Sequence, residues 1–359
     1  MRSAAVALVL AVLVTGCSGT SPETSPTNAS PGITNTVVPS GPPGGPVPVS
    51  SPSAPAAPRL GADRYAELAT ALHKRGVAIW WETDLVARWL EGPASFDQAI
   101  IRLGELGKVP GVVGFKVSDE IGYKDGLQTM ADAAQFLTAA KKRLGQVAPG
   151  KQLLVDAIVP ELGCLPWRGN NQQGCAQRVR LKYPAATAAA LESYLRAGLI
   201  DRLDLSTGLL EDVTYAKWGL TKREAQVDAW NRVKAQGWPQ LTILQARKAL
   251  AEPGGYQGDT TVATEDARTY LDVPFAAGAR AVDIWTWRQQ YQGNIVSLLE
   301  PGLSSNPLWS ELVRHRRDGR QLLTHMTPSQ MPAEPAAFNH ECDLAAAAFT
   351  AVFVAAGTG

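Results

Sequence analysis

Acidic residues follow one predicted strand in a pattern that could carry out proton transfer. The largely apolar run 112–117 is followed by Ser118, Asp119 and Glu120, which is the pattern of a buried β-strand that ends in two carboxylates. A strand of a (β/α) barrel delivers its catalytic side chain in this way, because the active site lies at the C-terminal ends of the strands. Side chains alternate along a strand, so Lys116, Ser118 and Glu120 share one side. We expect Glu120 to point into the barrel mouth, with Asp119 supporting it.

Two further acids lie on other strand-like segments. Glu82 follows one such segment, and Asp156 lies within another. Hydrolysis of a glycosidic bond needs one carboxylic acid with a raised pKa and a second carboxylate, and a neighbouring carboxylate raises the pKa of an acid. We therefore predict Glu120 as the acid/base, with Asp156 as the first candidate for its partner and Glu82 as the second. The alternative is that these acids are structural and pair with Lys116 and Arg247 inside the barrel.

Aromatic residues also gather at predicted strand ends. The chain has ten tryptophans, and an indole ring offers the CH-rich face of a sugar a flat apolar platform with a polar edge. Because ligands of barrels lie at the strand ends, we predict that some of these rings bind substrate together with Lys116 and Arg247. The alternative is that they are core residues. The predicted binding residues are Trp80, Trp81, Trp285 and Trp287, with Trp167 from a loop.

Helix-like and strand-like patterns alternate along the chain, which is typical of an α/β fold with parallel strands. Six strands are clear, whereas a (β/α)8 barrel of the TIM type needs eight. The sequence leaves open a complete barrel, a short barrel and an open doubly wound sheet. No glycine-rich dinucleotide turn follows a strand, so a nucleotide-binding sheet has little support. The predicted strands cover 77–81, 112–120, 152–159, 202–206, 241–246 and 281–287, with 294–299 as a short extra candidate.

Two segments resemble the clan A glycoside hydrolases and related barrel families. Residues 114–120 (GFKVSDE) are similar to the apolar strand of those families, which ends in Asp-Glu and is usually followed by Pro. Residues 283–287 (DIWTW), followed by GL at 302–303 and PLW at 307–309, are similar to their last strand and final loop. The resemblance covers residues 76–317 and implies that Glu120 closes the fourth strand as general acid/base.

The sequence departs from the pattern of that family at three places. Ile121 replaces the proline, one clear strand precedes the strand that ends at Glu120, and the segment 244–247 (LQAR) lacks the acid that the family uses as nucleophile. We predict a glycoside hydrolase-like protein that acts on a polysaccharide. The alternative is a non-catalytic carbohydrate-binding or scaffolding protein on a barrel fold.

The first residues have the features of a bacterial lipoprotein signal. Arg2 precedes a short apolar stretch that closes on LVTGC at 13–17, which resembles the lipobox in which the cysteine is lipidated. We assign residues 1–17 to a lipoprotein signal peptide, and the alternative is an ordinary cleaved signal with a chance cysteine. Residues 18–59 are rich in Ser, Thr, Pro and Gly and cannot bury enough apolar surface to fold, so we predict a disordered tether. The prediction is an exported protein held on the outer face of the cell membrane through lipidated Cys17.

The rest of the chain suggests domain boundaries and partners. We assign residues 60–321 to the barrel and 322–359 to a poorly defined tail rich in Ala and Pro. Cys164 and Cys175 bracket a polar loop in an exported protein, which predicts a disulfide that holds Trp167 over the cleft rim. The Cys and His residues lack metal-ligand spacing, so we expect no metal and no cofactor. The formal net charge of +1 gives no electrostatic footprint for nucleic acid.

Overall fold

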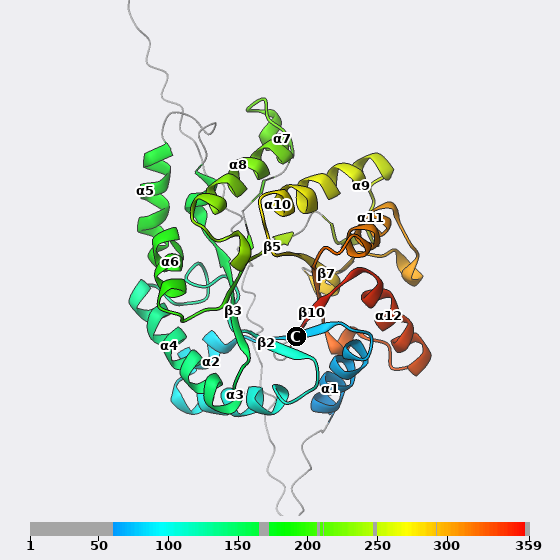
Figure 1. Ribbon diagram of the computed structural model, residues 1–359, viewed down its shortest axis with the longest axis horizontal. Helices are drawn as coiled ribbons and strands as arrows, with labels where there is room; N and C mark the ends of the chain where they lie inside the picture. The colour runs from blue at the N-terminus through cyan, green and yellow to red at the C-terminus, as the bar shows by residue number, and fades with distance from the viewer. Residues whose placement is uncertain are drawn as a thin grey trace, which may run out of the picture. The chain divides into compact units, whose positions relative to one another are not determined.

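Parallel strands and helices alternate around a closed ring, as the sequence pattern predicted (Figure 1). The structure, a computed structural model, describes residues 60–164, 172–206, 209–210, 212–246, 250–291 and 293–355. Its sheet has ten strands, of which β6 and β8 form an antiparallel extension on β7. The other eight are parallel, and the pairing of β10 with β1 and of β5 with β7 closes the ring. The barrel is therefore complete.

The elements alternate in the order of a (β/α)8 barrel. The ring strands are β1 (Ala78–Glu82), β2 (Val112–Lys116), β3 (Gln152–Ile158), β4 (Arg202–Ser206), β5 (Thr242–Ala246), β7 (Ala281–Tyr291), β9 (Leu322–Met326) and β10 (Ala351–Ala355). The extension consists of β6 (Glu252–Pro253) and β8 (Asn294–Ser297). The longer helices are α1 (Leu60–His73), α2 (Leu85–Glu91), α3 (Pro93–Leu106), α4 (Met130–Val147), α5 (Gln172–Lys182), α6 (Ala188–Arg196), α8 (Lys222–Ala235), α9 (Thr260–Ala267), α11 (Pro307–Arg317) and α12 (Pro335–Ala348). Shorter helical segments are α7 (Asp212–Ala216), α10 (Val273–Ala276), a π-helical turn (Arg268–Asp272) and several 3-10 turns, among them η1 (Pro160–Gly163).

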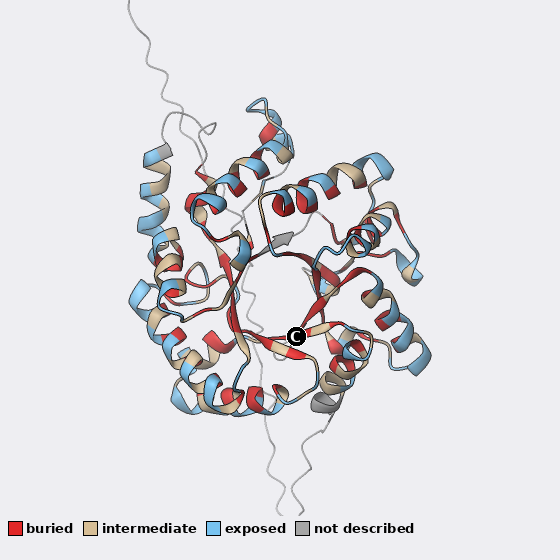
Figure 2. Cartoon of the chain, viewed as in Figure 1, coloured by how far each residue is buried: buried red, intermediate tan, exposed pale blue. Residues whose placement is uncertain are grey.

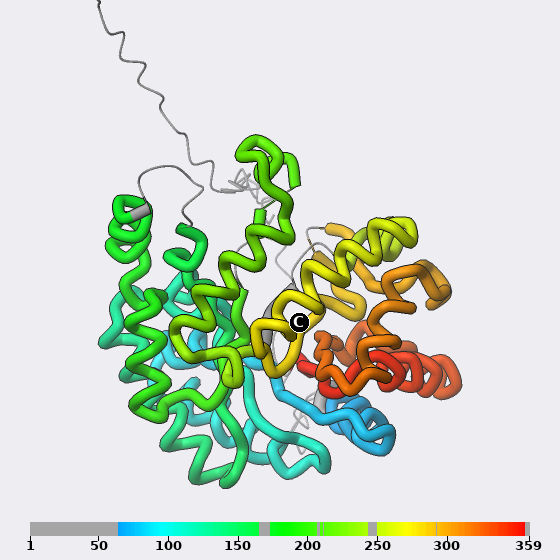
Figure 3. The backbone as a smooth tube through the Cα atoms, turned by 45° about the horizontal axis from the view of Figure 1, so that its top comes forward, coloured from blue at the N-terminus to red at the C-terminus, as the bar shows by residue number. Residues whose placement is uncertain are grey.

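The segment that the sequence analysis set apart as a tail completes the ring. β9 pairs with β7, and β10 pairs with both β9 and β1. Helix α12 contacts α1, so the first and last described parts of the chain are neighbours (Figure 3). The boundary of the barrel therefore extends from α1 to the end of β10, beyond the predicted limit at 321.

Capping residues determine where several helices begin, and burial against the ring determines which side of each helix is apolar. Thr129 and Asp132 form a capping box at the start of α4, and Thr221 and Glu224 form one at the start of α8. The helices turn their buried residues toward the ring and their exposed residues outward (Figure 2). In the described part of the chain, none of the helices has the length and apolar character required to cross a lipid bilayer.

Candidate active site

A layer of charged side chains crosses the inside of the ring above an apolar floor. On β1, β3, β7 and β9 the charged residue stands two positions after a floor residue, so both face the interior. Strands run from the floor toward the C-terminal mouth, so the charged layer lies on the mouth side. The apolar floor consists of Trp80, Leu154, Ala281, Leu323, Ala351 and Phe353. We define the ionic layer as Glu82, Lys116, Asp156, Asp204, Asp283 and His325, one residue from each of six strands.

Lys116 joins three carboxylates of the ionic layer. Its Nζ lies 3.1 Å from Glu82 Oε1, 3.2 Å from Asp156 Oδ2 and 2.9 Å from Asp204 Oδ2. The lysine side chain is 1% exposed, and both aspartates are fully buried. Nζ also lies 4.9 Å from the centre of the Phe353 ring in the apolar floor. These contacts fix the ammonium group in the middle of the barrel.

His325 joins two carboxylates on the other side of the layer. Its Nδ1 lies 2.8 Å from Glu82 Oε2, and its Nε2 lies 2.7 Å from Asp283 Oδ2. The backbone that carries this ring is also fixed, because the Thr286 hydroxyl donates to the His325 carbonyl over 3.1 Å. Glu82 thus bridges Lys116 and His325, and its side chain is 26% exposed. It is the member of the layer that is most open to the mouth.

The contacts shift the pKa values of the layer in opposite directions. Burial, only partly opposed by Lys116, raises the pKa of Asp204 to about 8. Burial would lower the pKa of His325, but Asp283 and Glu82 outweigh it and raise that pKa to about 10. Burial would likewise lower the pKa of Lys116, but the surrounding carboxylates hold it well above its usual range. The two cations lower the pKa of Glu82 despite its burial. The layer therefore combines an ionised glutamate, two cations and an aspartate whose pKa is raised toward neutral pH.

Three residues of the layer could also bind a metal ion. Asp204, Asp283 and His325 each offer one ligand atom, and these atoms lie within 4.8 Å of one another. Glu82 accepts a hydrogen bond at Nδ1 of His325 when that nitrogen is protonated, as carboxylates beside metal-binding histidines do. The prediction of no metal rested on the spacing of the Cys and His residues, whereas this group combines one histidine with two aspartates that are far apart along the chain.

Glu120 and Asp119 lie beyond the ionic layer. The β2–β3 ladder continues to Ser118, whose carbonyl accepts from the Asp156 N–H, but Glu120 has a left-handed backbone with φ of 55°. The strand alternation that was expected to aim Glu120 into the mouth therefore ends before it. Glu120 is half-buried near Tyr123, whose pKa its charge helps to raise, and Asp119 is exposed. In contrast, Glu82 and Asp156 do pair with Lys116, as the structural alternative proposed.

The predicted tryptophans lie in three different environments. Trp80 belongs to the apolar floor. Trp81 is fully buried on the outer side of the ring, where its indole donates to the Leu106 carbonyl over 2.9 Å. Trp287 is buried, and its indole donates to Glu341 over 3.0 Å. Trp285 remains at the mouth, where it packs edge-on against Tyr291 and lines a cavity of about 200 Å³.

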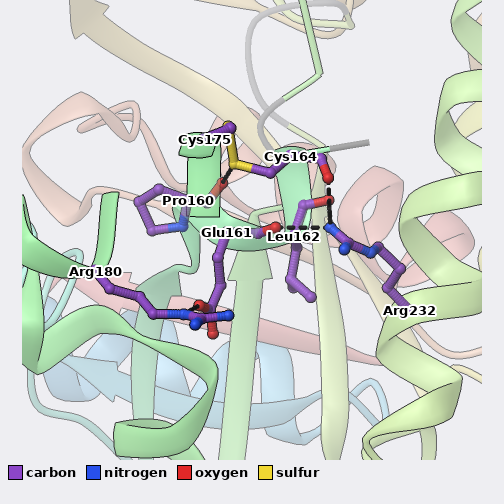
Figure 4. Close-up of a disulfide and its surroundings, with 7 residues drawn as sticks. All are labelled: Pro160, Glu161, Leu162, Cys164, Cys175, Arg180 and Arg232. Carbon is purple, nitrogen blue, oxygen red and sulfur yellow. Dashed lines mark hydrogen bonds and ion pairs between the residues drawn. A yellow bond between two sulfur atoms is a disulfide. The ribbon is translucent and has the colours of Figure 1, made fainter. Parts of the chain in front are cut away.

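The disulfide between Cys164 and Cys175 is present, with Cα atoms 5.7 Å apart (Figure 4). It joins η1 to α5, and Arg232 from α8 donates to the Glu161 carbonyl over 2.7 Å and to the Cys164 carbonyl over 3.0 Å. The Glu161 carboxylate pairs with Arg180. These contacts fasten the start of the β3–α5 loop. Trp167, Arg247 and Cys17 lie outside the described residues, so their predicted roles stay predictions.

The sequence analysis missed His325 and gave no role to Asp204 and Asp283. His325 lies in the segment that was assigned to the tail. Asp204 lies in the predicted strand 202–206, and Asp283 is the first residue of the segment 283–287. The signal that could have identified Asp283 and His325 is the two-residue step from a small or apolar interior position to a charged one, which also identifies Glu82 and Asp156. Asp204 lacks this signal, because Arg202 stands two positions before it.

Comparisons with known proteins were made at three levels. No family model and no curated protein matches the chain. One similar solved structure is "a putative phosphonomutase" from Burkholderia cenocepacia, with 12% identity and a TM-score of 0.38, covering 81% of this chain and 92% of that one. Another is the carboxyl transferase domain of Rhizobium etli pyruvate carboxylase with oxalate, with 13% identity and a TM-score of 0.41, covering 86% of this chain and 46% of that one.

The topology corrects the predicted family. Glu120 follows the second strand and not the fourth, and the segment 283–287 belongs to the sixth ring strand, with two more after it, so the assignment to clan A is wrong. The similar structures are named "a putative phosphonomutase" and a carboxyl transferase domain. The predicted glycoside hydrolase, its carbohydrate-binding alternative and the carbohydrate partner are wrong as well. Export and lipid attachment through Cys17 stay predictions, because residues 1–59 lie outside the described residues.

Proposed function

We propose that the protein is a barrel enzyme that transfers protons to or from a small polar substrate at the ionic layer. The observation that carries this proposal is the convergence of six ionisable side chains, from six strands, in one layer on the mouth side of the ring. The C-terminal mouth is where (β/α) barrels place their active sites. A proton donor works best when its pKa is near the operating pH, and the pKa of Asp204 is raised to about 8.

Two buried polar atoms support a ligand at this level. Asp283 Oδ1 and Ser118 Oγ are buried and make no hydrogen bond within the described part of the protein. Buried polar atoms are seldom left without a partner, so a hydroxyl or amine of a substrate could donate to Asp283 Oδ1, and a hydroxyl or carbonyl could accept from Ser118 Oγ. The ring interior of an eight-stranded barrel is filled by side chains. A substrate can therefore present only one functional group to the layer, which favours a small molecule over a polymer.

The experiment measures proton transfer without requiring a known substrate. The full chain would be incubated in D2O with mixtures of small polar metabolites, and NMR would follow deuterium incorporation and conversion. We expect at least one compound to react, with a loss of about 100-fold or more in Asp204→Asn. Asp343→Asn, in an exposed ion pair with Arg75, is the matched control and should react as the wild type does. Turnover that survives both Asp204→Asn and His325→Gln, or no reaction with any compound, would reject the proposal.

Metal-assisted catalysis at the same layer is a second candidate function. The convergence of Asp204, Asp283 and His325 favours it, and a bound cation would take the place of the proton between His325 Nε2 and Asp283. Calorimetric titration with Mn²⁺, Zn²⁺ and Mg²⁺ tests this candidate. Binding at one site that is lost in Asp283→Asn supports it, and binding that Asp283→Asn leaves unchanged contradicts it.

A further inference from the structure

A second cavity lies at the opposite, N-terminal face of the barrel. It has a volume of about 570 Å³ and is lined by residues at or near the starts of seven ring strands, among them Ala78, Val112 and Gln152. Trp80, Ala281, Leu323 and Ala351 of the apolar floor form its inner wall. The floor separates this cavity from the ionic layer, so what binds here is independent of the proposed function. We call it the basal pocket.

The basal pocket is positively charged. Lys151, Arg202 and Arg280 line it, and its described lining includes no Asp or Glu. The nearest acid in sequence, Asp201, is already used, because its carboxylate lies 2.6 Å from Lys141 Nζ and accepts the Leu153 N–H over 2.7 Å. The pocket therefore gathers three cations without a neighbouring carboxylate in its wall.

Two of these cations are held in place by the backbone. Lys151 Nζ donates to the Val112 carbonyl over 2.6 Å, and Arg202 donates to the Asp201 carbonyl over 2.8 Å. A guanidinium has five N–H donors and an ammonium has three, so each side chain can also bind a ligand. Burial and the nearby charge of Arg280 lower the pKa of the Arg202 guanidinium, because both disfavour its charged form. An anion between these groups would relieve that repulsion.

The walls define the chemistry of the anion. Guanidinium groups bind phosphate through paired hydrogen bonds, and a lysine adds a point charge. Gln152 and Gln321 add amide groups to the rim. The indole of Trp80 and the small apolar side chains around it suit an apolar or aromatic part of the ligand. We propose that the basal pocket is a binding site for a small organic phosphate, with the phosphate between Arg202, Arg280 and Lys151 and the organic part against the floor.

The test is calorimetric titration of the full chain with phenyl phosphate and, separately, with inorganic phosphate. We expect saturable binding of phenyl phosphate, weaker binding of inorganic phosphate, and weaker binding of both at higher salt. A hydrogen bond to a charged group contributes about 1.5–3 kcal/mol, which corresponds to about a tenfold or greater loss of affinity in Arg280→Gln. Arg280 is exposed, so this variant should fold. Arg202→Gln should weaken binding at least as much.

The matched control is Arg143→Gln, because Arg143 is partly exposed in an ion pair with Asp97 outside the pocket. Its affinity for phenyl phosphate should equal that of the wild type. If the wild-type chain does not bind phenyl phosphate, the proposal is overturned. If Arg280→Gln and Arg202→Gln bind it as tightly as Arg143→Gln does, the phosphate binds elsewhere and the assignment to the basal pocket is wrong.

Discussion

Replacing Lys116 by methionine is the most direct way to measure what holds the ionic layer together. The substitution keeps the length and apolar stem of the side chain but removes the charge that lies within 3.2 Å of three carboxylates. Removing one partner of a buried ion pair costs about 3–5 kcal/mol, because the other charge remains buried without compensation. We therefore expect the free energy of unfolding to fall by about that amount and the melting temperature to fall by roughly 6–20 °C.

Equilibrium unfolding in urea at pH 7 measures the effect, and Lys141→Met is the matched control. Lys141 lies 2.6 Å from Asp201, but both side chains are about one-third exposed. A pair of this kind contributes about 0–1 kcal/mol. The comparison sets a buried ammonium group with three carboxylate partners against a partly exposed one with a single carboxylate partner.

The effect of Lys116→Met should also depend on pH. Without the ammonium group, the pKa of Asp204 rises further in the folded state, and the pKa of Glu82 is lowered less. A carboxylate with a raised pKa in the folded protein contributes stability at low pH that is lost as the pH rises. The variant should therefore be closer to the wild type at pH 5 than at pH 8. A loss no larger than that of Lys141→Met, or a loss that is equal at both pH values, would refute the account of the layer.

Three further outcomes are expected. The pKa of His325 is raised from 6.5 to about 10. The protonated imidazole therefore contributes its full stability below pH 6.5, and this contribution is lost as the pH approaches 10. The midpoints of urea unfolding at pH 7 and pH 10 should differ less in His325→Gln than in the wild type. Gly114→Ala should lower the free energy of unfolding by about 1–3 kcal/mol, because the added Cβ would overlap the Gln152 carbonyl and the Trp80 indole ring. In Gly145→Ala, on α4, the added Cβ meets nothing within 4 Å, so this variant should raise the free energy of unfolding by about 0.5–1 kcal/mol. Reducing the disulfide, whose cysteines are 11 positions apart, should lower the free energy of unfolding by about 2–3 kcal/mol, and mass spectrometry without reductant should find neither Cys164 nor Cys175 alkylated.

The six predicted ring strands were found because each is a short apolar run between helical patterns. The two ring strands that were missed do not stand out as apolar runs between helical patterns. β9 (LLTHM) carries Thr324 and His325 in its second half, and β10 (AVFVA) follows closely on the alanine-rich end of α12. Both segments form strands because they pair with strands that lie far away in the chain, and a local sequence pattern cannot show such pairing.

Strand parity located part of the candidate site and failed at specific positions. The alternation holds for Glu82 and Asp156, which stand two positions after the floor residues Trp80 and Leu154. It failed for Trp287 because the register of β7 against β9 shifts between Ile284 and Arg288. It failed for Glu120 because the backbone turns there. Irregular backbone at a strand end therefore limits what a sequence pattern can say about side-chain direction.

The position of the ionic layer argues that it has a function beyond holding the fold together. Barrel interiors are usually filled by branched apolar residues, and a buried ion pair is seldom more stable than apolar side chains of the same volume. This chain supplies apolar side chains where the floor needs them, since Leu154 and Leu323 stand two residues before Asp156 and His325. The change from apolar to ionisable occurs on several strands at one level, and that level lies on the mouth side of the floor. Charged groups placed there, where an apolar layer would fold at least as well, are best explained by a ligand that they contact.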